Sequence, residues 1–361
     1  MREKCILHIG MHKTGTSSIQ YALFNHLNSN AFNYCKLGRV NHNHAISSIF
    51  KNNPESYHAN VSLNWSNDDL IEFINSSKSL LVKSLDSLDS QVTEIISGED
   101  IGYFNQEEAK RLKIYLSQYF NDIVVVVYLR SPVSYLQSAF QELVKHGLHE
   151  FDFTYCDPKY TRFKYFSEIF GFDSIIFRNY DEVLKEKNNV VDDFTELFGI
   201  ELNKYTTNTF SNSTLSLEAI SLLYVYQIYY ARSHNAQYFK GQNKLIDALK
   251  YVGDRKLCFS QSITEPIFNK NKVGIEFIKS KCNIDYTNSS DNNNSEYPIT
   301  CEDDLISTAI SSIEILITLL NGEENSSIED IEISKHGVAE LMHTLDLQVN
   351  GPIAASLRIP K

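Results

Sequence analysis

The residues best suited to chemistry lie in a glycine-containing loop near the start of the chain. The loop reads Gly10-Met11-His12-Lys13-Thr14-Gly15-Thr16-Ser17-Ser18, with the GxxxxG spacing of a phosphate-binding loop. In such a loop, backbone N–H groups point inward and the following helix offers the positive end of its dipole. Thr16 stands where the GxxxxGK[ST] pattern has its lysine, and the lysine of this loop is Lys13. The loop therefore predicts an anion site.

A second candidate anion contact follows the strongest apolar run of the chain, residues 123–129. Arg130 comes directly after this run, and Ser138 lies eight residues later in a helix that Pro132 can open. An arginine at a strand end and a serine on the next helix can contact one phosphate, as a charged fork and a neutral donor. Nucleotide hydrolases that use Mg²⁺ need an Asp at the end of a neighbouring strand. Here the strand ends in an arginine, so we expect no metal site.

These side chains need a parallel sheet to bring them to one edge. Apolar runs predict buried strands, and amphipathic spacing predicts helices between them. The expected strands are residues 5–9, 92–97, 123–129 and 174–177, and the expected helices include 17–27, 68–88, 106–120, 158–170 and 181–198. Residues 41–67 are rich in His and Asn and predict an irregular stretch.

This order predicts an α/β fold: a P-loop-like three-layer fold with a parallel sheet flanked by helices, plus a mainly helical C-terminal portion. We expect residues 1–260 to form the α/β core and residues 261–361 a helical extension packed on it.

The composition limits the partners. The chain has 361 residues with 33 basic and 45 acidic side chains, a net charge of −12, which argues against sequence-independent binding of nucleic acid. No run reaches the roughly 18–20 apolar residues of a membrane span. The start of the chain lacks the apolar length of a signal peptide, and its six cysteines are scattered without a CxxC pair. We therefore expect a cytoplasmic protein without a membrane span, and the sequence does not indicate an oligomeric state.

The loop and the arginine segment together resemble the PAPS-dependent sulfotransferases. His12-Lys13-Thr14-Gly15-Thr16-Ser17-Ser18 is similar to the 5′-phosphosulfate loop of that family, written PKxGTT or HKTGTT. The segment Tyr128-Leu129-Arg130-Ser131-Pro132, with Ser138 beyond it, is similar to the 3′-phosphate motif. The strand that ends in Arg178-Asn179-Tyr180 resembles, more loosely, the bacterial carbohydrate-sulfotransferase branch. The likeness covers roughly residues 5 to 200.

The resemblance implies a donor, an acceptor and roles for these residues. The donor would be 3′-phosphoadenosine 5′-phosphosulfate (PAPS), the product 3′,5′-adenosine bisphosphate (PAP), and the acceptor a hydroxyl or amine of a carbohydrate, such as a glycan or lipid-linked glycan. No metal would be required. Lys13, Thr14, Gly15, Thr16, Ser17 and Ser18 would bind the 5′-phosphosulfate, and Arg130 and Ser138 the 3′-phosphate. The chain lacks the Arg-Lys-Gly segment of one subgroup, so the sequence assigns no adenine contact.

Sulfonyl transfer to a hydroxyl needs a group that accepts the hydroxyl proton. Glu99 is our first candidate, because it follows a strand directly and would share the sheet edge with the loop and Arg130. Asp100 is a neighbour that could replace it, and His12 is the second candidate. Glu99 could instead cap the following turn. Lys13, Glu99 and His12 are thus the expected catalytic residues.

Two other functions fit parts of the same sequence. A P-loop kinase or nucleotide hydrolase would use Mg²⁺ with ATP or GTP, and the missing strand-end Asp counts against it. A catalytically inactive nucleotide-binding relative would bind the donor product, and a change at Glu99 would leave that binding intact.

Overall fold

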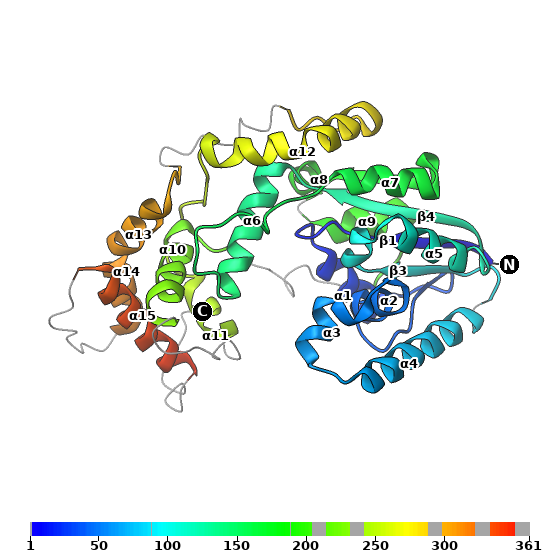
Figure 1. The fold of residues 1–361 in the computed structure, drawn as a ribbon, viewed down its shortest axis with the longest axis horizontal. Coiled ribbons are helices and arrows are strands. Elements are labelled where there is room, and N and C mark those ends of the chain that lie inside the picture. Colours follow the sequence, from blue (N-terminus) through cyan, green and yellow to red (C-terminus); the bar gives the residue numbers. More distant parts are fainter. Residues whose placement is uncertain are drawn as a thin grey trace. The chain divides into compact units, whose positions relative to one another are not determined.

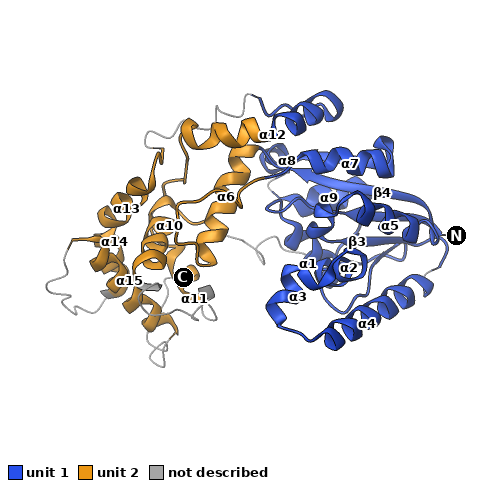
Figure 2. Cartoon of the chain, viewed as in Figure 1, with its two compact units in different colours: residues 1–131, 158–211, 271–287 blue, residues 132–157, 212–270, 288–361 orange. Residues whose placement is uncertain are grey.

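The computed structural model describes residues 2–87, 89–187, 189–203, 214–231, 242–287, 298–321 and 333–350. The chain divides into two compact units, coloured separately in Figure 2. Unit 1 consists of residues 1–131, 158–211 and 271–287, and unit 2 of residues 132–157, 212–270 and 288–361. The units are described one at a time below.

A parallel five-stranded sheet forms the centre of unit 1 (Figure 1). Its order is β2-β3-β1-β4-β5, and every neighbouring pair is parallel. The strands are β1 (Arg2–His8), β2 (Phe32–Tyr34), β3 (Thr93–Ser97), β4 (Phe120–Leu129) and β5 (Ile175–Asn179). Since β1 lies between β3 and β4, the loop after β1 begins where the strand order reverses, which is the usual ligand position in open α/β sheets.

Both faces of the sheet are buried, so unit 1 has three layers. On one face Ile6 and Val126 pack with residues of α1 (Thr16–His26) and α9 (Val190–Phe198). On the opposite face Leu7 and Val127 are also without solvent exposure. Strands covered on both sides are near-continuous apolar runs, which is why the sequence pattern predicts them. The observed architecture confirms the expected P-loop-like α/β class.

The remaining helices of unit 1 connect these strands or pack beside them. They are α2 (Asn43–Phe50), η1 (Pro54–Ser56), α3 (His58–Leu63), α4 (Asn67–Asp86), η2 (Glu99–Tyr103), α5 (Gln106–Leu116), α7 (Thr161–Phe170), η3 (Phe172–Ser174) and α8 (Tyr180–Lys187). The expected helix over residues 181–198 is therefore two helices, α8 and α9.

The expectation of an irregular stretch over residues 41–67 is wrong. Two helices, α2 and α3, form there and bury polar side chains that pair with one another. His44 Nε2 lies 2.6 Å from Asn60 Oδ1, and Asn60 Nδ2 donates to Ser48 Oγ at 3.0 Å. Because these buried groups are polar, no apolar stripe marks the helices in the sequence.

In its described part, unit 2 has helices and no named strand (Figure 1). The helices are α6 (Pro132–Lys145), α10 (Leu217–Val225), η5 (Tyr226–Ala231), α11 (Gln242–Leu249), α13 (Glu302–Ser311), α14 (Ile313–Asn321) and α15 (Lys335–Asn350). Helix α12 (Gln261–Cys282) begins in unit 2 and continues into unit 1 after residue 270. The expected helical C-terminal portion is confirmed.

The compact units are grouped differently from the expected division into residues 1–260 and 261–361, which stays a prediction about domains. Among the described helices, none combines the length and the apolar character that crossing a lipid bilayer requires.

Candidate anion-binding and proton-transfer site

The loop after β1 is held by backbone bonds to the end of β4. Met11 N–H donates to the Tyr128 carbonyl at 3.0 Å, and Tyr128 N–H donates to the Gly10 carbonyl at 2.8 Å. The buried Thr14 hydroxyl donates to the Met11 carbonyl at 2.6 Å. This hydroxyl therefore shapes the loop from inside, and what Thr14 can offer a ligand is its backbone N–H.

Two glycines are required by this loop. Gly10 and Gly15 have φ of 88° and 73°, in the left-handed region. A Cβ on Gly10 would lie 3.0 Å from the Glu99 Cβ, and one on Gly15 would lie 2.6 Å from the Val190 Cγ1. Lys13 has a φ of 66°, which is uncommon for a residue with a side chain.

The N-terminus of α1 is suited to an anion. Its N-cap is Gly15, which has no side chain to cap the first turn. The N–H groups that open a helix lack a carbonyl four residues earlier, although here the Ser18 N–H donates to the Gly15 carbonyl at 3.0 Å, and the helix dipole is positive at this end. Ser17 is exposed and Ser18 half-buried on this turn, beside the buried Thr16. The expected 5′-phosphosulfate residues thus lie together at one helix end.

Arg130 lies against this loop. Its Nη1 donates to the Lys13 carbonyl at 2.6 Å, and its guanidinium carbon is 5.2 Å from the centre of the Tyr180 ring. Its backbone carbonyl accepts a hydrogen bond from the Tyr160 hydroxyl, and its N–H points to Met11 Sδ at 3.4 Å. A permanent cation is therefore fixed beside the loop at the end of β4.

Ser138, the other expected 3′-phosphate contact, lies on α6 in unit 2. Its assignment rests on the sequence and stays a prediction.

Glu99 begins the short helix η2 directly after β3 and packs on Gly10. Burial raises the pKa of its carboxyl, and Asp100 raises it further, while the charges of His12 and Lys13 and a hydrogen bond with Thr16 partly offset the effect. A carboxylate whose pKa is raised is a better proton acceptor once ionised. The structure thus brings Glu99, His12 and Lys13 to one sheet edge.

Asp100 is committed to other contacts. His12 Nε2 lies 2.8 Å from Asp100 Oδ1, the Tyr57 hydroxyl donates to Oδ2 at 2.5 Å, and the Asp100 N–H donates to Asn43 Oδ1 at 2.9 Å. Burial alone would raise the pKa of Asp100, but the hydrogen bonds from His12 and Tyr57 outweigh it and lower the pKa. An ionised carboxylate only accepts, so Nε2 of His12 carries the proton and Nδ1 faces away from Asp100.

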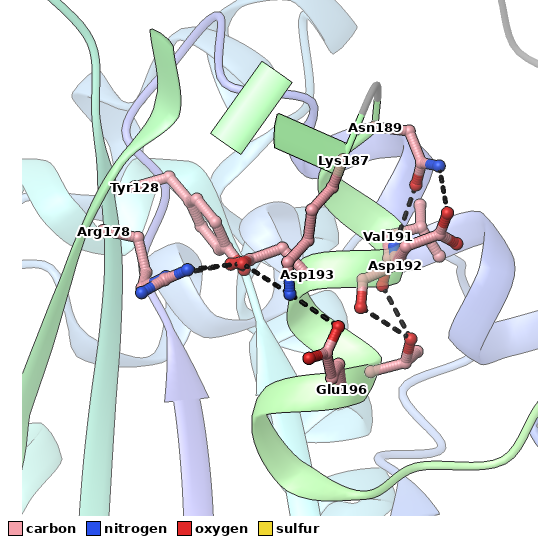
Figure 3. A network of polar contacts seen from close by, with 9 residues as sticks. Tyr128, Arg178, Lys187, Asn189, Val191, Asp192, Asp193 and Glu196 are labelled. Carbon is pink, nitrogen blue, oxygen red and sulfur yellow. Dashed lines mark hydrogen bonds and ion pairs between the residues drawn. The ribbon is translucent and has the colours of Figure 1, made fainter. Parts of the chain in front are cut away.

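A polar network centred on the buried Asp193 supports the helix that packs on the loop (Figure 3). Asp193 on α9 accepts from the Tyr128 hydroxyl at 2.9 Å and from Arg178 Nη2 at 2.5 Å. Arg178 and Tyr128 outweigh the effect of burial and lower the pKa of Asp193. Because Val190 at the start of α9 contacts Gly15, the network fixes one wall of the loop.

Sequence reasoning missed the partners of these residues. Tyr57, Asn43 and Asp193 are far in sequence from the groups they bind, and each lies in a segment without a motif. Arg178 was noted only as part of a loose resemblance. Among the described residues, no three His, Cys, Asp or Glu side chains gather as a metal-binding group.

The comparisons with known proteins do not identify the chemistry of this site. No protein-family model matches the chain, and no curated protein matches it. A solved structure with a similar fold is the crystal structure of a sulfotransferase from Alicyclobacillus acidocaldarius, with 14% identity, covering 66% of this chain and 99% of that chain. The TM-score is 0.36, so this likeness carries no argument about function.

Proposed function

We propose that the chain is a sulfotransferase that moves a sulfonyl group from PAPS to a hydroxyl or amine of a carbohydrate or glycan-like acceptor. The observation that carries the proposal is the contact between Arg130 Nη1 and the Lys13 carbonyl at 2.6 Å. It fixes a planar cation against an anion-binding loop at the strand end where a nucleotide hydrolase would hold a carboxylate for Mg²⁺. Two anion contacts side by side suit a donor that has a phosphate at each end.

The residues present fit this donor. The uncapped N-terminus of α1 and the loop N–H groups suit the 5′-phosphosulfate, and the Arg130 guanidinium suits the 3′-phosphate. Gly10 and Gly15 keep side chains out of the loop on both sides. When bound, the donor supplies the sulfonyl group and leaves as PAP.

Each polar side chain then has a task. Lys13 and the loop N–H groups stabilise negative charge as it develops on the leaving phosphate. Glu99 accepts the proton of the acceptor hydroxyl, a role supported by its raised pKa and by its closeness to Gly10 of the loop. His12, oriented by Asp100, can contact the acceptor or the sulfonate through Nδ1. With donor and acceptor meeting in the cytoplasm, a glycan or lipid-linked glycan precursor would be the acceptor.

Calorimetric titration with PAP, beside ATP and GTP with and without Mg²⁺, tests the proposal. We expect metal-independent binding of PAP that is much tighter than binding of ATP or GTP. A preference for Mg²⁺-ATP or Mg²⁺-GTP would show a variant kinase or hydrolase loop. PAP binding without transfer to any acceptor, unaffected by Glu99→Gln, would indicate an inactive relative.

A further inference from the structure

The guanidinium of Arg162 is buried, and no hydrogen-bond partner for it lies in the described part of the chain. It lies in the first turn of α7 and is 7% exposed. None of its three side-chain nitrogens has a hydrogen-bond partner in the described part of the chain, and none is exposed to solvent. Arg178, by contrast, is paired with Asp193, and Arg255 with Glu218. A buried charge without a hydrogen-bonded counter-ion is costly, so such a group usually marks an absent partner.

The surroundings of Arg162 add positive potential. Helix α7 has ten residues, no acidic residue in its first turn and no side-chain cap, so its positive end is not neutralised by its own residues. Lys159 adds a second cation, with its Nζ 5.9 Å from the centre of the Tyr103 ring. Arg162 stacks on the same ring at 3.8 Å. Stacking uses the face of the guanidinium, and its buried N–H edge still has no hydrogen-bond partner among the described residues.

This cationic position lies beside the proposed base. Tyr103 ends the short helix η2 that Glu99 begins, and its ring centre is 5.1 Å from the His12 ring. The Tyr103 ring therefore contacts the guanidinium and the imidazole. The donor anions are assigned to the loop and Arg130, so the anion that Arg162 lacks belongs to the acceptor.

We propose that Arg162 binds a carboxylate of an acidic sugar in the acceptor, an inference that rests on the proposed sulfotransferase function. The carboxylate accepts two parallel N–H bonds from the edge of the guanidinium, in the geometry that arginine and carboxylate share. Tyr103 is half-buried whereas Phe163, the other ring on Arg162, is fully buried. The acceptor sugar would therefore reach the guanidinium from the side of Tyr103.

Binding of two small probes to the full chain tests this inference. Methyl glucuronide and methyl glucoside differ at one carbon, which is a carboxylate in the first and a hydroxymethyl group in the second. With the chain saturated by PAP, we expect the glucuronide to bind about 10-fold tighter or more, the factor that one charge-assisted hydrogen bond supplies. The substitution Arg162→Met should abolish the difference. Lys164→Met, which removes an exposed cation from the same helix, should preserve it.

A melting experiment and two further variants, Arg162→Gln and Arg162→Lys, separate an effect on binding from an effect on folding. Arg162→Met should melt at the same temperature as the wild type or higher, because it removes an unpaired buried charge. Arg162→Gln gives a second neutral side chain if the methionine variant folds poorly, and Arg162→Lys should lose most of the discrimination because it lacks the planar fork.

Several outcomes would overturn the inference. Equal binding of both probes to the wild type would do so, and so would discrimination that survives in Arg162→Met. Weaker PAP binding in Arg162→Met would show that Arg162 contacts the donor rather than the acceptor. Tighter binding of glucose 6-phosphate than of the glucuronide would show that Arg162 binds a phosphate rather than a carboxylate. Repeating the probe titrations without PAP separates this inference from the proposed function. If the chain binds no PAP but still prefers the glucuronide through Arg162, the sulfotransferase proposal fails and carboxylate binding by Arg162 stands.

Discussion

Lys13 and Arg130 lie in direct contact, yet we expect their replacement to impair different steps of the reaction. Lys13→Ala should lower turnover by about 10²-fold or more, because it removes charge stabilisation at the leaving phosphate. Arg130→Ala should mainly weaken PAP binding. Steady-state kinetics together with calorimetry separates the two, and unchanged PAP affinity in the arginine variant would remove the 3′-phosphate assignment.

The raised pKa of Glu99 predicts the acid limb of the reaction. The carboxylate accepts a proton only when ionised, so turnover should fall as the pH falls through its pKa. Because burial raises that pKa, the limb should lie above the ordinary glutamate value of about 4.3. The pH profile of kcat/KM measures it, and Glu99→Gln should lose most of its turnover and this limb. Retained turnover in that variant would move the base to His12 or elsewhere.

Glu94 makes the stability of the fold dependent on pH. Burial raises the pKa of this carboxyl on β3 to about 7, despite hydrogen bonds from Asn33 and Ser84. The folded chain therefore keeps a proton that the unfolded chain has lost, and stability should fall as the pH rises from about 4.5 to about 7. The cost above that range is on the order of 3 kcal/mol. Urea unfolding at pH 5 and pH 8 should show a smaller loss in Glu94→Gln, and equal losses would contradict this origin.

The site residues that sequence could identify are those within a short motif. The loop and Arg130 could be proposed because each belongs to a contiguous pattern next to a recognisable strand. The bond between Tyr57 and Asp100 joins residues 43 positions apart, and neither segment carries a pattern that indicates the other. The stacking of Arg162 on Tyr103 was missed for the same reason.

Helix α9 is the element whose position should control the loop. Asp193→Asn removes a buried charge that Arg178 and Tyr128 bind. It should lower the free energy of unfolding by on the order of 2–3 kcal/mol, less than the loss of a fully buried ion pair because Arg178 is partly exposed. It should also weaken PAP binding, since Val190 of the same helix contacts Gly15.

Asp192→Asn is the matched control for this prediction. Asp192 is exposed and contacts Asn189, so its replacement should change stability by less than about 0.5 kcal/mol. Urea unfolding and PAP titration of both variants provide the measurement. Equal effects of the two changes would show that the network does not support the loop.

Strands and helices could be predicted from the sequence wherever apolar residues follow one regular pattern. The buried strands were predictable because β4 contains an unbroken apolar run, residues 123–129, and because β1 and β3 contain shorter apolar runs, residues 5–7 and 95–96. Strand β2 has three residues, too few for a pattern. Helices α2 and α3 were missed because His44, Ser48 and Asn60 pair inside the fold, and composition alone cannot distinguish paired polar residues from solvated ones.

At the scale of the whole molecule, residues late in the chain complete the unit that holds the loop. Residues 271–287 belong to unit 1. There Tyr286 stacks on Tyr160 with ring centres 6.0 Å apart, and a Cβ on Gly274 would lie 2.6 Å from the Tyr160 Cβ. Since the Tyr160 hydroxyl donates to the Arg130 carbonyl, this segment supports the anion site.

A chain that stops at residue 260 should therefore lose PAP binding, although it retains every expected donor-binding residue. Circular dichroism and calorimetry on residues 1–260 provide the test. Tyr286→Phe, which keeps the ring stack and loses a 3.4 Å hydrogen bond to Asn179, should bind PAP nearly as well as the wild type. Full PAP affinity in the shortened chain would show that 1–260 is a self-sufficient core.

The contact between Gly10 and Glu99 has a consequence for redesign. The two backbones lie so close at this point that any side chain at Gly10 would push Glu99 away and widen the spacing between the anion loop and the base. Tyr103 ends η2, and Arg162 of α7 contacts its ring, away from the contact between Gly10 and Glu99. An engineer who wishes to change which acceptor is modified should therefore begin at Arg162, because a change at Tyr103 would also remove the ring that contacts His12.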